Sequence, residues 1–295
     1  QPPQTNALLN SVTDDRMIVL DLFCESNPVW KITESFCGKP WIWCIIQDFG
    51  DVVSMHGGLP QIAEGLVGAL NAPERGKLCG AGFIMEGMGY NPVVQDLMSD
   101  IFWSPEKKEM KSWITAYAQQ RYGKQIKATE KAWQGLLDAV YSYPGRGDNV
   151  VCKRPALVPY KLQGTNKLSQ LAAVWNVLTG CASELQDVDT YQYDLVNVAR
   201  QALSELTGIY HGRLMASFEK GEKERFQNEA WAYLELLDDM ETLLATRQEF
   251  LLGKWIADAK RWGGNDAEKE LLEWNARNQI TLWGPKDSGL HDYAQ

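Results

Sequence analysis

Hydrophobic residues are arranged differently in the first hundred residues of the chain and in the remainder. Three short apolar runs, each ending in polar residues, occupy positions 16–23, 40–50 and 78–87. Continuous rather than alternating hydrophobicity is typical of strands buried on both faces, as in parallel sheets covered by helices. Residues 60–70 carry apolar side chains at helical spacing and can form the crossover that parallel strands need. The pattern therefore predicts parallel strands with a connecting helix.

The three predicted strands all end in acidic or amide side chains: Asp21 and Glu25, Gln47 and Asp48, and Glu86. In a parallel (β/α)8 barrel, residues at the C-terminal ends of strands stand on the face where the chemistry is done. Such a barrel uses eight strands, and three alone would leave long apolar edges exposed. We therefore expect residues 1–95 to be the C-terminal part of a (β/α)8 catalytic barrel, truncated at its N-terminus.

From about residue 96 onward, apolar positions recur at helical spacing. Ser104 and Pro105 predict a helix start, and Gly123 predicts its end. Further helices are predicted over residues 127–141, 168–178, 189–219, 225–253 with a possible break after Leu244, and 266–282 with Asn265 and Glu268 as a variant capping box. Residues 144–165, rich in Pro and Gly, predict a loop. The expected fold class is α/β plus all-α, with residues 96–295 forming an α-helical bundle domain of five or six helices.

Composition narrows the classes of function. The formal net charge of -9 argues against a nucleic-acid partner, whose phosphates would repel such a surface. Twelve Trp residues weakly favour a carbohydrate site, because indole faces stack on sugar rings, although most single Trp residues are expected in the core. No apolar run reaches the roughly 18 residues of a membrane span. A neutral substrate is compatible with these features.

The cysteines and histidines give no sign of a metal site. Six Cys residues lack CxxC spacing, and three His residues are too few for an evident structural zinc site. We expect mostly buried thiols and leave one or two disulfides open. No metal or organic cofactor is predicted, and a homo-oligomer remains open because the sequence does not indicate the oligomeric state.

Glu86, within Met85-Glu86-Gly87, is the strongest local candidate for chemistry. A carboxylate at the C-terminal end of a barrel strand, followed by Gly, can face a substrate with little steric hindrance. The alternative, a solvated glutamate at a strand end, is left open by the pattern alone. For Asp21 and Glu25 a structural hydrogen bond or salt bridge is favoured over catalysis.

Several segments carry a family resemblance. Residues 82–103 (GFIMEGMGYNPVVQDLMSDIFW) resemble the signature of glycoside hydrolase family 89, the α-N-acetylglucosaminidases. Residues 16–30 are similar to its Leu-Asp-Leu-Phe-Ala-Glu/Asp strand, and residues 40–50 to its Ile-Trp-Cys-Met-Leu-His-Asn-Phe-Gly-Gly. Later stretches follow in the order of the family: 121–123, 193–203, 250–260 and 273–285. The resemblance covers essentially the whole chain.

The resemblance implies an exo-acting retaining glycoside hydrolase that removes terminal α-linked N-acetylglucosamine from glycans such as heparan sulfate, without a metal. Glu86 matches the catalytic nucleophile. The acid/base of the family is a Glu preceded by Asn on an earlier barrel strand, whereas the one Asn-Glu here, Asn228-Glu229, begins a helix. We therefore expect the acid/base before residue 1. The resemblance also implies a lysosomal, vacuolar or secreted location. The alternative is a catalytically degenerate carbohydrate-binding homologue.

The resemblance also suggests residues that bind substrate. The C-terminal segment is similar to one that supplies Trp, an aliphatic residue and Tyr to the sugar pocket of the family, which carries over to Trp283, Leu290 and Tyr293. The spacing is one residue longer here, and His291 replaces an apolar residue. Packing of the helical bundle is the alternative role of Tyr293.

The second strand departs from the family pattern at its end. Gln47-Asp48 stands where the family has His-Asn, and Asp51 replaces the second Gly of Phe-Gly-Gly. If Asp48 faces the pocket, a third carboxylate would raise the pKa of Glu86 and slow the enzyme near neutral pH. Because Asp51 and the loop that follows it, residues 51–60, also differ from the family pattern, we expect the acceptor side of the site to differ too.

Overall fold

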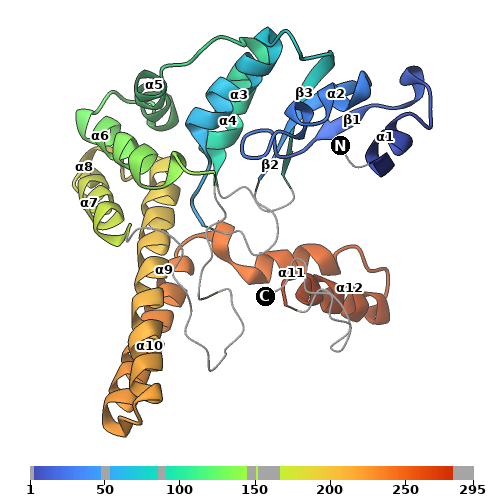
Figure 1. Cartoon of the computed structure of the whole chain (residues 1–295). Coiled ribbons are helices and arrows are strands. Elements are labelled where there is room, and N and C mark those ends of the chain that lie inside the picture. Colours follow the sequence, from blue (N-terminus) through green and yellow to red (C-terminus); the bar gives the residue numbers. More distant parts are fainter. Residues whose placement is uncertain (1–2, 48–53, 86–90, 145–150, 152–166, 282–295) are drawn as a thin grey trace. The chain divides into compact units, whose positions relative to one another are not determined.

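The computed structural model describes residues 3–47, 54–85, 91–144, 151 and 167–281. The chain divides into two compact units, which we consider separately (Figure 1). The first unit contains residues 1–49, 55–118 and 136–146, and the second contains residues 50–54, 119–135 and 147–295. The sheet lies in the first unit and the longest helices lie in the second.

The strands of the first unit form a parallel sheet in the order β1-β2-β3, which confirms the predicted parallel arrangement. The strands are β1 (Val19–Asp21), β2 (Pro40–Gln47) and β3 (Lys77–Met85). Asp21 lies opposite Trp43, and Gln47 lies opposite Met85. The first strand is shorter than the predicted run, because the chain turns after Asp21 and the Cys24 amide donates to the Cys44 carbonyl at 3.0 Å.

One face of the sheet packs against α3 (Leu59–Asn71) and α4 (Pro92–Trp103). Trp43 is 1 % exposed and packs so closely on α3 that a Cβ at Gly65 would lie 2.8 Å from its ring. Phe83 of β3 stacks on Phe102 of α4 at 5.9 Å between ring centroids. Helix α3 confirms the predicted crossover helix, since it lies between the parallel strands β2 and β3 in the chain.

Short elements precede β2 that the hydrophobic pattern did not predict. They are α1 (Pro3–Leu9), the 3-10 turns η1 (Asp14–Arg16) and η2 (Val29–Lys31), and α2 (Glu34–Cys37). All four residues of α2 have positive φ values, between 49° and 58°, and Gly38 continues the turn at 79°. Non-glycine residues seldom adopt this left-handed conformation, so propensity alone does not indicate it.

The remaining helices begin with α5 (Met110–Tyr122) and α6 (Lys127–Leu136), which continues into the π-helical turn η3 (Leu137–Tyr141). They are followed by α7 (Leu168–Thr179), α8 (Ala182–Leu185), α9 (Asp189–Glu219), α10 (Lys223–Leu244), the 3-10 turn η5 (Gln248–Phe250), α11 (Leu252–Lys260) and α12 (Asp266–Gln279). Helices α9 and α10 lie side by side (Figure 1). The prediction for residues 189–219 is confirmed at both ends.

Two helix predictions need correction: the helix start at Ser104 and the number of helices. Ser104 does not start a helix: it ends α4, and its amide donates to the Asp100 carbonyl at 2.9 Å. Helix α5 begins at Met110 because the Glu109 carboxylate accepts from the Ser112 amide at 2.7 Å. The possible break after Leu244 in the helix predicted over residues 225–253 is confirmed, because α10 ends at Leu244 and α11 begins at Leu252. Helix α8 was not predicted. The described segments from α5 to α12 therefore hold eight helices rather than five or six.

Two other helix ends agree with prediction. Gly123 follows α5 with a φ of +65°, as a C-terminal glycine should. The Asn265 side chain accepts from the Glu268 amide at 3.0 Å, and the Glu268 carboxylate accepts from the Gly264 amide at 2.7 Å. This arrangement is the predicted variant of the capping box.

A buried polar cluster joins helices of the second unit. Asp194 on α9 accepts from Arg121 through Nε at 2.6 Å and Nη2 at 2.7 Å, and from the Tyr122 hydroxyl at 2.8 Å. The Trp133 indole donates to the same hydroxyl at 2.9 Å. Because each buried group has a partner, the cluster fastens α5 and α6 to α9.

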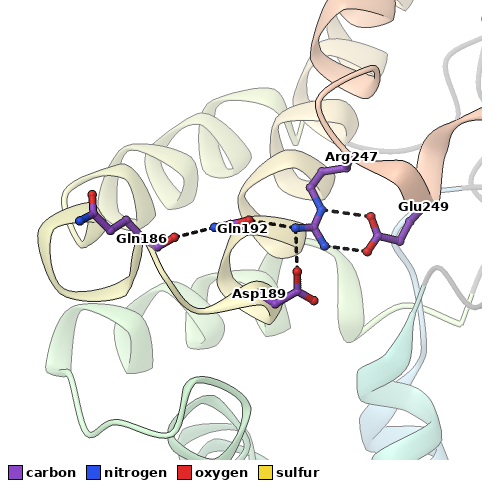
Figure 2. A network of polar contacts seen from close by, with 5 residues as sticks. All are labelled: Gln186, Asp189, Gln192, Arg247 and Glu249. Atoms are coloured by element: carbon purple, nitrogen blue, oxygen red, sulfur yellow. Dashed lines mark hydrogen bonds and ion pairs between the residues drawn. The ribbon is translucent and has the colours of Figure 1, made fainter.

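A second, more exposed network surrounds Arg247 (Figure 2). Its guanidinium donates to Asp189 at 2.9 Å and to Gln192 at 3.0 Å, both in the first turn of α9. Two further N–H groups bind the Glu249 carboxylate at 3.0 and 2.6 Å. Arg247 thereby ties the segment between α10 and α11 to the start of α9.

The cysteines only partly match expectation. Cys24, Cys44 and Cys181 are buried free thiols, whereas Cys37 is half-buried and Cys79 is exposed. In the part of the chain that the structure describes, no group of three or more potential metal ligands comes together. None of the described helices combines the length and the apolar character that a membrane crossing requires.

Candidate active site

The residues singled out for catalysis and binding lie outside the described residues. These are Glu86, Asp48, Trp283, Leu290 and Tyr293. The structure does describe the edge of the sheet that leads to the first two. Asp21, Gln47 and Met85 are the last residues of three neighbouring parallel strands. Gln47 lies opposite Met85, whereas Asp21 lies opposite Trp43, so β1 ends earlier than its neighbour. All three C-terminal ends lie toward the same end of the sheet. We call this the strand-end edge.

Asp21 has a structural role at the strand-end edge, as the sequence favoured. It is 3 % exposed, and its Oδ2 accepts from the Trp30 amide at 2.8 Å. Burial raises the pKa of Asp21, and the hydrogen bond from the Trp30 amide opposes that change. The bond holds the chain from Cys24 to Trp30 against β1, which fixes the turn that follows the strand.

Glu25 lies in that turn and is much less well satisfied. It is 7 % exposed, and its Oε1 accepts a long hydrogen bond from the Ser26 hydroxyl at 3.4 Å. Its Oε2 is buried and has no hydrogen-bond partner within the described structure. Burial raises the pKa of Glu25 to about 7. The structural bond expected for this residue is therefore absent at one oxygen, and the carboxyl can gain or lose a proton near neutral pH.

Gln47 ends β2 with its side chain buried between the sheet and the helices. Its Nε2 donates to the Gly57 carbonyl at 3.4 Å, whereas its Oε1 has no partner among the residues described. A cavity of about 10 Å³ lies next to Gln47 and Asn91, enough for one water molecule at most. The layer beneath the strand-end edge is thus closely packed.

Asn91 joins the connections that follow β2 and β3. It is fully buried, and its Oδ1 accepts from the His56 amide at 3.2 Å. The adjacent Gly57 amide donates to the Tyr143 carbonyl at 3.1 Å. Sequence reasoning missed Asn91 as a site residue. Its position between a strand end and a helix start was the available signal, but its partner depends on tertiary structure.

A larger open groove lies elsewhere, between α11 and α12. Its volume is about 620 Å³, and four cationic side chains line it: Lys260, Arg261, Lys269 and Arg277. Each of the four forms an ion pair with a carboxylate of the same helices. The groove therefore presents little uncompensated charge, and its described lining offers no carboxylate for glycoside chemistry.

Comparisons with known proteins agree with the architecture. Residues 1–105 match the family model described as the Alpha-N-acetylglucosaminidase (NAGLU) tim-barrel domain, and residues 113–295 match the corresponding C-terminal domain. The predicted fold class is thus confirmed: strands of a (β/α)8 barrel followed by an α-helical domain. The division at residues 95 and 96 stays a prediction.

Individual relatives give the same result. Human α-N-acetylglucosaminidase is 34% identical over 301 residues, a match that covers 99% of this chain and 40% of the human protein. A family 89 glycoside hydrolase from Clostridium perfringens, solved with 2-acetamido-1,2-dideoxynojirmycin, has a TM-score of 0.90 and 27% identity, covering 100% of this chain and 34% of its own. The same values hold for a variant of a Clostridium perfringens enzyme with two Glu-to-Gln substitutions, in complex with its substrate GlcNAc-alpha-1,4-galactose.

Proposed function

The chain belongs to the α-N-acetylglucosaminidase family, glycoside hydrolase family 89, and on this premise we propose that it forms part of an exo-acting retaining glycosidase that removes terminal α-linked N-acetylglucosamine. The chain spans 40% of the length of its human relative and 34% of the bacterial chain. The proposed activity is therefore that of a longer polypeptide in which these 295 residues supply part of the barrel and the helical domain.

Glu86 is the proposed nucleophile. The observation that carries this assignment is that β3 is a parallel strand ending at Met85, opposite Gln47 at the end of β2, so that residue 86 comes directly after the strand-end edge. In barrels of this class the reacting groups stand at that end of the strands. The Met-Glu-Gly motif of the family falls at this position in the sequence.

The proposed reaction has two steps. The Glu86 carboxylate attacks the anomeric carbon as the glycosidic bond breaks, and a second carboxyl gives its proton to the departing oxygen. That second group then takes a proton from water, which displaces Glu86 with overall retention of configuration. Retention requires the two carboxyl groups to lie about 5 Å apart. We place the second group in polypeptide outside these 295 residues, on an Asn-Glu pair at a strand end.

Substrate recognition is proposed for Trp283, Leu290 and Tyr293, by correspondence with the C-terminal segment of the family. An indole and a phenol can stack on the apolar faces of a sugar ring while the phenol also forms a hydrogen bond. Glycans such as heparan sulfate are the proposed substrates, and a lysosome, a vacuole or the cell exterior the proposed place of action. Asp48, if it faces the pocket, would raise the pKa of Glu86.

A second candidate function is a carbohydrate-binding homologue that has lost turnover. Gln47-Asp48, in place of the His-Asn of the family, favours this alternative because it changes the chemistry at the end of the strand next to β3. Both candidates predict binding of terminal N-acetylglucosamine, and only the first predicts its release.

The test is hydrolysis of a chromogenic α-N-acetylglucosaminide by the 295-residue chain, by the longer polypeptide and by its Glu86→Gln variant. We expect activity in the longer wild-type protein and in its Glu64→Gln variant, and none in the 295-residue chain or in Glu86→Gln. Glu64→Gln is the control, because Glu64 is an exposed carboxylate on α3 whose nearest cation, Lys107, lies 3.9 Å away. Sugar binding without hydrolysis in the wild type would favour the binding homologue. Substantial activity in Glu86→Gln would contradict the nucleophile assignment.

A further inference from the structure

The residues on either side of the short connection after β3 contact β2 and the connection that follows it. At one end, Met85 pairs with Gln47 in the parallel sheet. At the other end, the Oδ1 of Asn91 accepts from the His56 amide at 3.2 Å. The segment between these anchors contains residues 86–90, and the proposed nucleophile is its first residue.

The side chain of Asn91 is used in an unusual way. Asn91 is the N-cap residue of α4, a position where an asparagine side chain commonly accepts from an amide of its own helix. Here it makes no such cap, and its Oδ1 binds a backbone amide 35 residues earlier in the chain. Because Asn91 is fully buried, water does not compete for this bond. The side chain therefore joins two connections at the strand-end edge rather than capping α4.

The donor of this bond is itself held in place. The Gly57 amide, next to His56, donates to the Tyr143 carbonyl at 3.1 Å, and the Gly57 carbonyl accepts from Gln47 Nε2 at 3.4 Å. A Cβ at Gly57 would lie 2.8 Å from Val94, so α4 also packs directly on this peptide. The His56 amide is thus held in place by its neighbours, and its hydrogen bond to Asn91 fixes the position of Asn91.

From these contacts we infer that Asn91 is a positioning residue for the reaction, fixing the connection that carries Glu86 through its bond to the His56 amide. The inference rests on the proposed function. Reacting atoms must be held within a few tenths of an ångström, and a misplacement of about 1 Å can lower a rate about 100-fold. Loss of the bond should therefore lower kcat much more than it weakens substrate binding.

The test compares Asn91→Leu and Asn91→Asp in the longer polypeptide. Leucine has nearly the same shape but no acceptor for the His56 amide, whereas aspartate keeps an acceptor oxygen. For Asn91→Leu we expect kcat to fall about 10- to 100-fold with KM within about threefold of wild type, and for Asn91→Asp a clearly smaller fall. The affinity for 2-acetamido-1,2-dideoxynojirmycin should stay near that of wild type in both.

Asn71→Leu is the matched control. Asn71 is an exposed residue at the other end of α3, where its Nδ2 donates to the Val67 carbonyl, and the substitution should leave kcat unchanged. A folded Asn91→Leu protein with kcat within about twofold of wild type would overturn the inference. If Asn91→Leu does not fold, Asn91→Ser decides, because its shorter side chain also loses the bond. Wild-type kcat in that variant would overturn the inference, and a lowered kcat with intact inhibitor binding would support it.

Failure of the proposed function gives a different result. In that case wild type and Asn71→Leu are both inactive, and the inference falls with the function. Activity in wild type, Asn71→Leu and Asn91→Leu alike leaves the glycosidase assignment standing and overturns only the role of Asn91.

Discussion

Two deeply buried carboxylates, Asp194 in the second unit and Glu25 in the first, are in opposite situations. Asp194 in the second unit is 4 % exposed and accepts three hydrogen bonds, two from Arg121 and one from Tyr122. Glu25 in the first unit is 7 % exposed and has a buried oxygen without a described partner. A buried polar group lowers stability unless it is paired, so the Asp194 cluster serves the fold, whereas Glu25 is a cost to it.

The poorly satisfied Glu25 lies near the ends of the strands. Glu25 follows β1 at the strand-end edge, and Gln47, at the end of β2, also has a buried oxygen without a described partner. Poorly satisfied buried groups persist where something other than stability favours them, and functional sites are the usual place. The Asp194 cluster thus holds helices of the second unit together, whereas Glu25 and Gln47 at the strand-end edge each keep a buried oxygen that no described residue pairs.

The largest effect is expected from breaking the satisfied cluster. Arg121→Met would leave Asp194 buried without its cation, and we expect a loss of about 3–5 kcal/mol in the free energy of unfolding. Urea unfolding monitored by circular dichroism measures it. Arg277→Met is the control, because Arg277 forms an exposed pair with Glu273 one helical turn away, and no measurable change is expected. Equal, small changes in both variants would contradict the structural role of the cluster.

A smaller effect, an increase in the free energy of unfolding, is expected from replacing Glu25 with Gln. Burial raises its pKa from 4.5 to about 7 in the folded protein, so the folded state holds a proton that the unfolded chain releases. The stability contributed by the neutral carboxyl is complete below pH 4.5 and is lost as the pH rises through about 7. Glu25→Gln cannot ionise, so it should exceed wild type by up to about 3 kcal/mol above that range.

The measurement for Glu25 is urea unfolding of wild type and Glu25→Gln at two pH values, one at 4.5 and one above 7. At pH 4.5, where the unfolded carboxyl is half protonated, the two proteins should be nearly equal in stability. Glu64→Gln, on the surface of α3, should follow wild type at both pH values. A difference between Glu25→Gln and wild type that does not change with pH would mean that the Glu25 carboxyl does not titrate in this range.

The smallest effect is expected from Arg247→Met, which tests whether burial or the number of hydrogen bonds determines how much a polar network stabilises the fold. Arg247 makes four side-chain hydrogen bonds (Figure 2), yet its partner Asp189 is 81% exposed. Because water competes for these partners, we expect Arg247→Met to cost only about 1 kcal/mol of unfolding free energy. Urea unfolding beside Arg121→Met provides the measurement. A loss as large as that of Arg121→Met would show that burial is not what distinguishes the two networks.

The sequence predicted those elements whose periodicity is long and regular. Helix α9 matches its predicted range, and the apolar runs of β2 and β3 gave the parallel strands. The prediction of a helix start at Ser104 was wrong. Serine is a residue type that suits a helix start, but in the fold Ser104 follows the end of α4, and Glu109 caps α5. Local propensity could not indicate the left-handed turn of α2, which depends on packing around it.

The candidate site was predictable to a similar degree. Polar residues at strand ends indicated the strand-end edge, since parallel strands end together. The bond between Asn91 and His56 was not predictable, because it joins residues 35 positions apart and replaces the local cap that an asparagine at a helix start normally makes. The unpaired oxygen of Glu25 was missed for the same reason: the number of partners that a buried group finds is a tertiary property.

The most direct test of the central claim is to trap the glycosyl-enzyme. The longer polypeptide would be treated with a fluorinated glycosyl fluoride of N-acetylglucosamine, which transfers its sugar to the nucleophile but is released slowly, and the labelled peptide would be sequenced by mass spectrometry. We predict that the sugar is attached to Glu86 and that Glu86→Gln takes up no label. A label on another carboxylate, such as Asp48 or Glu25, in an enzyme that still turns over substrate would contradict the account.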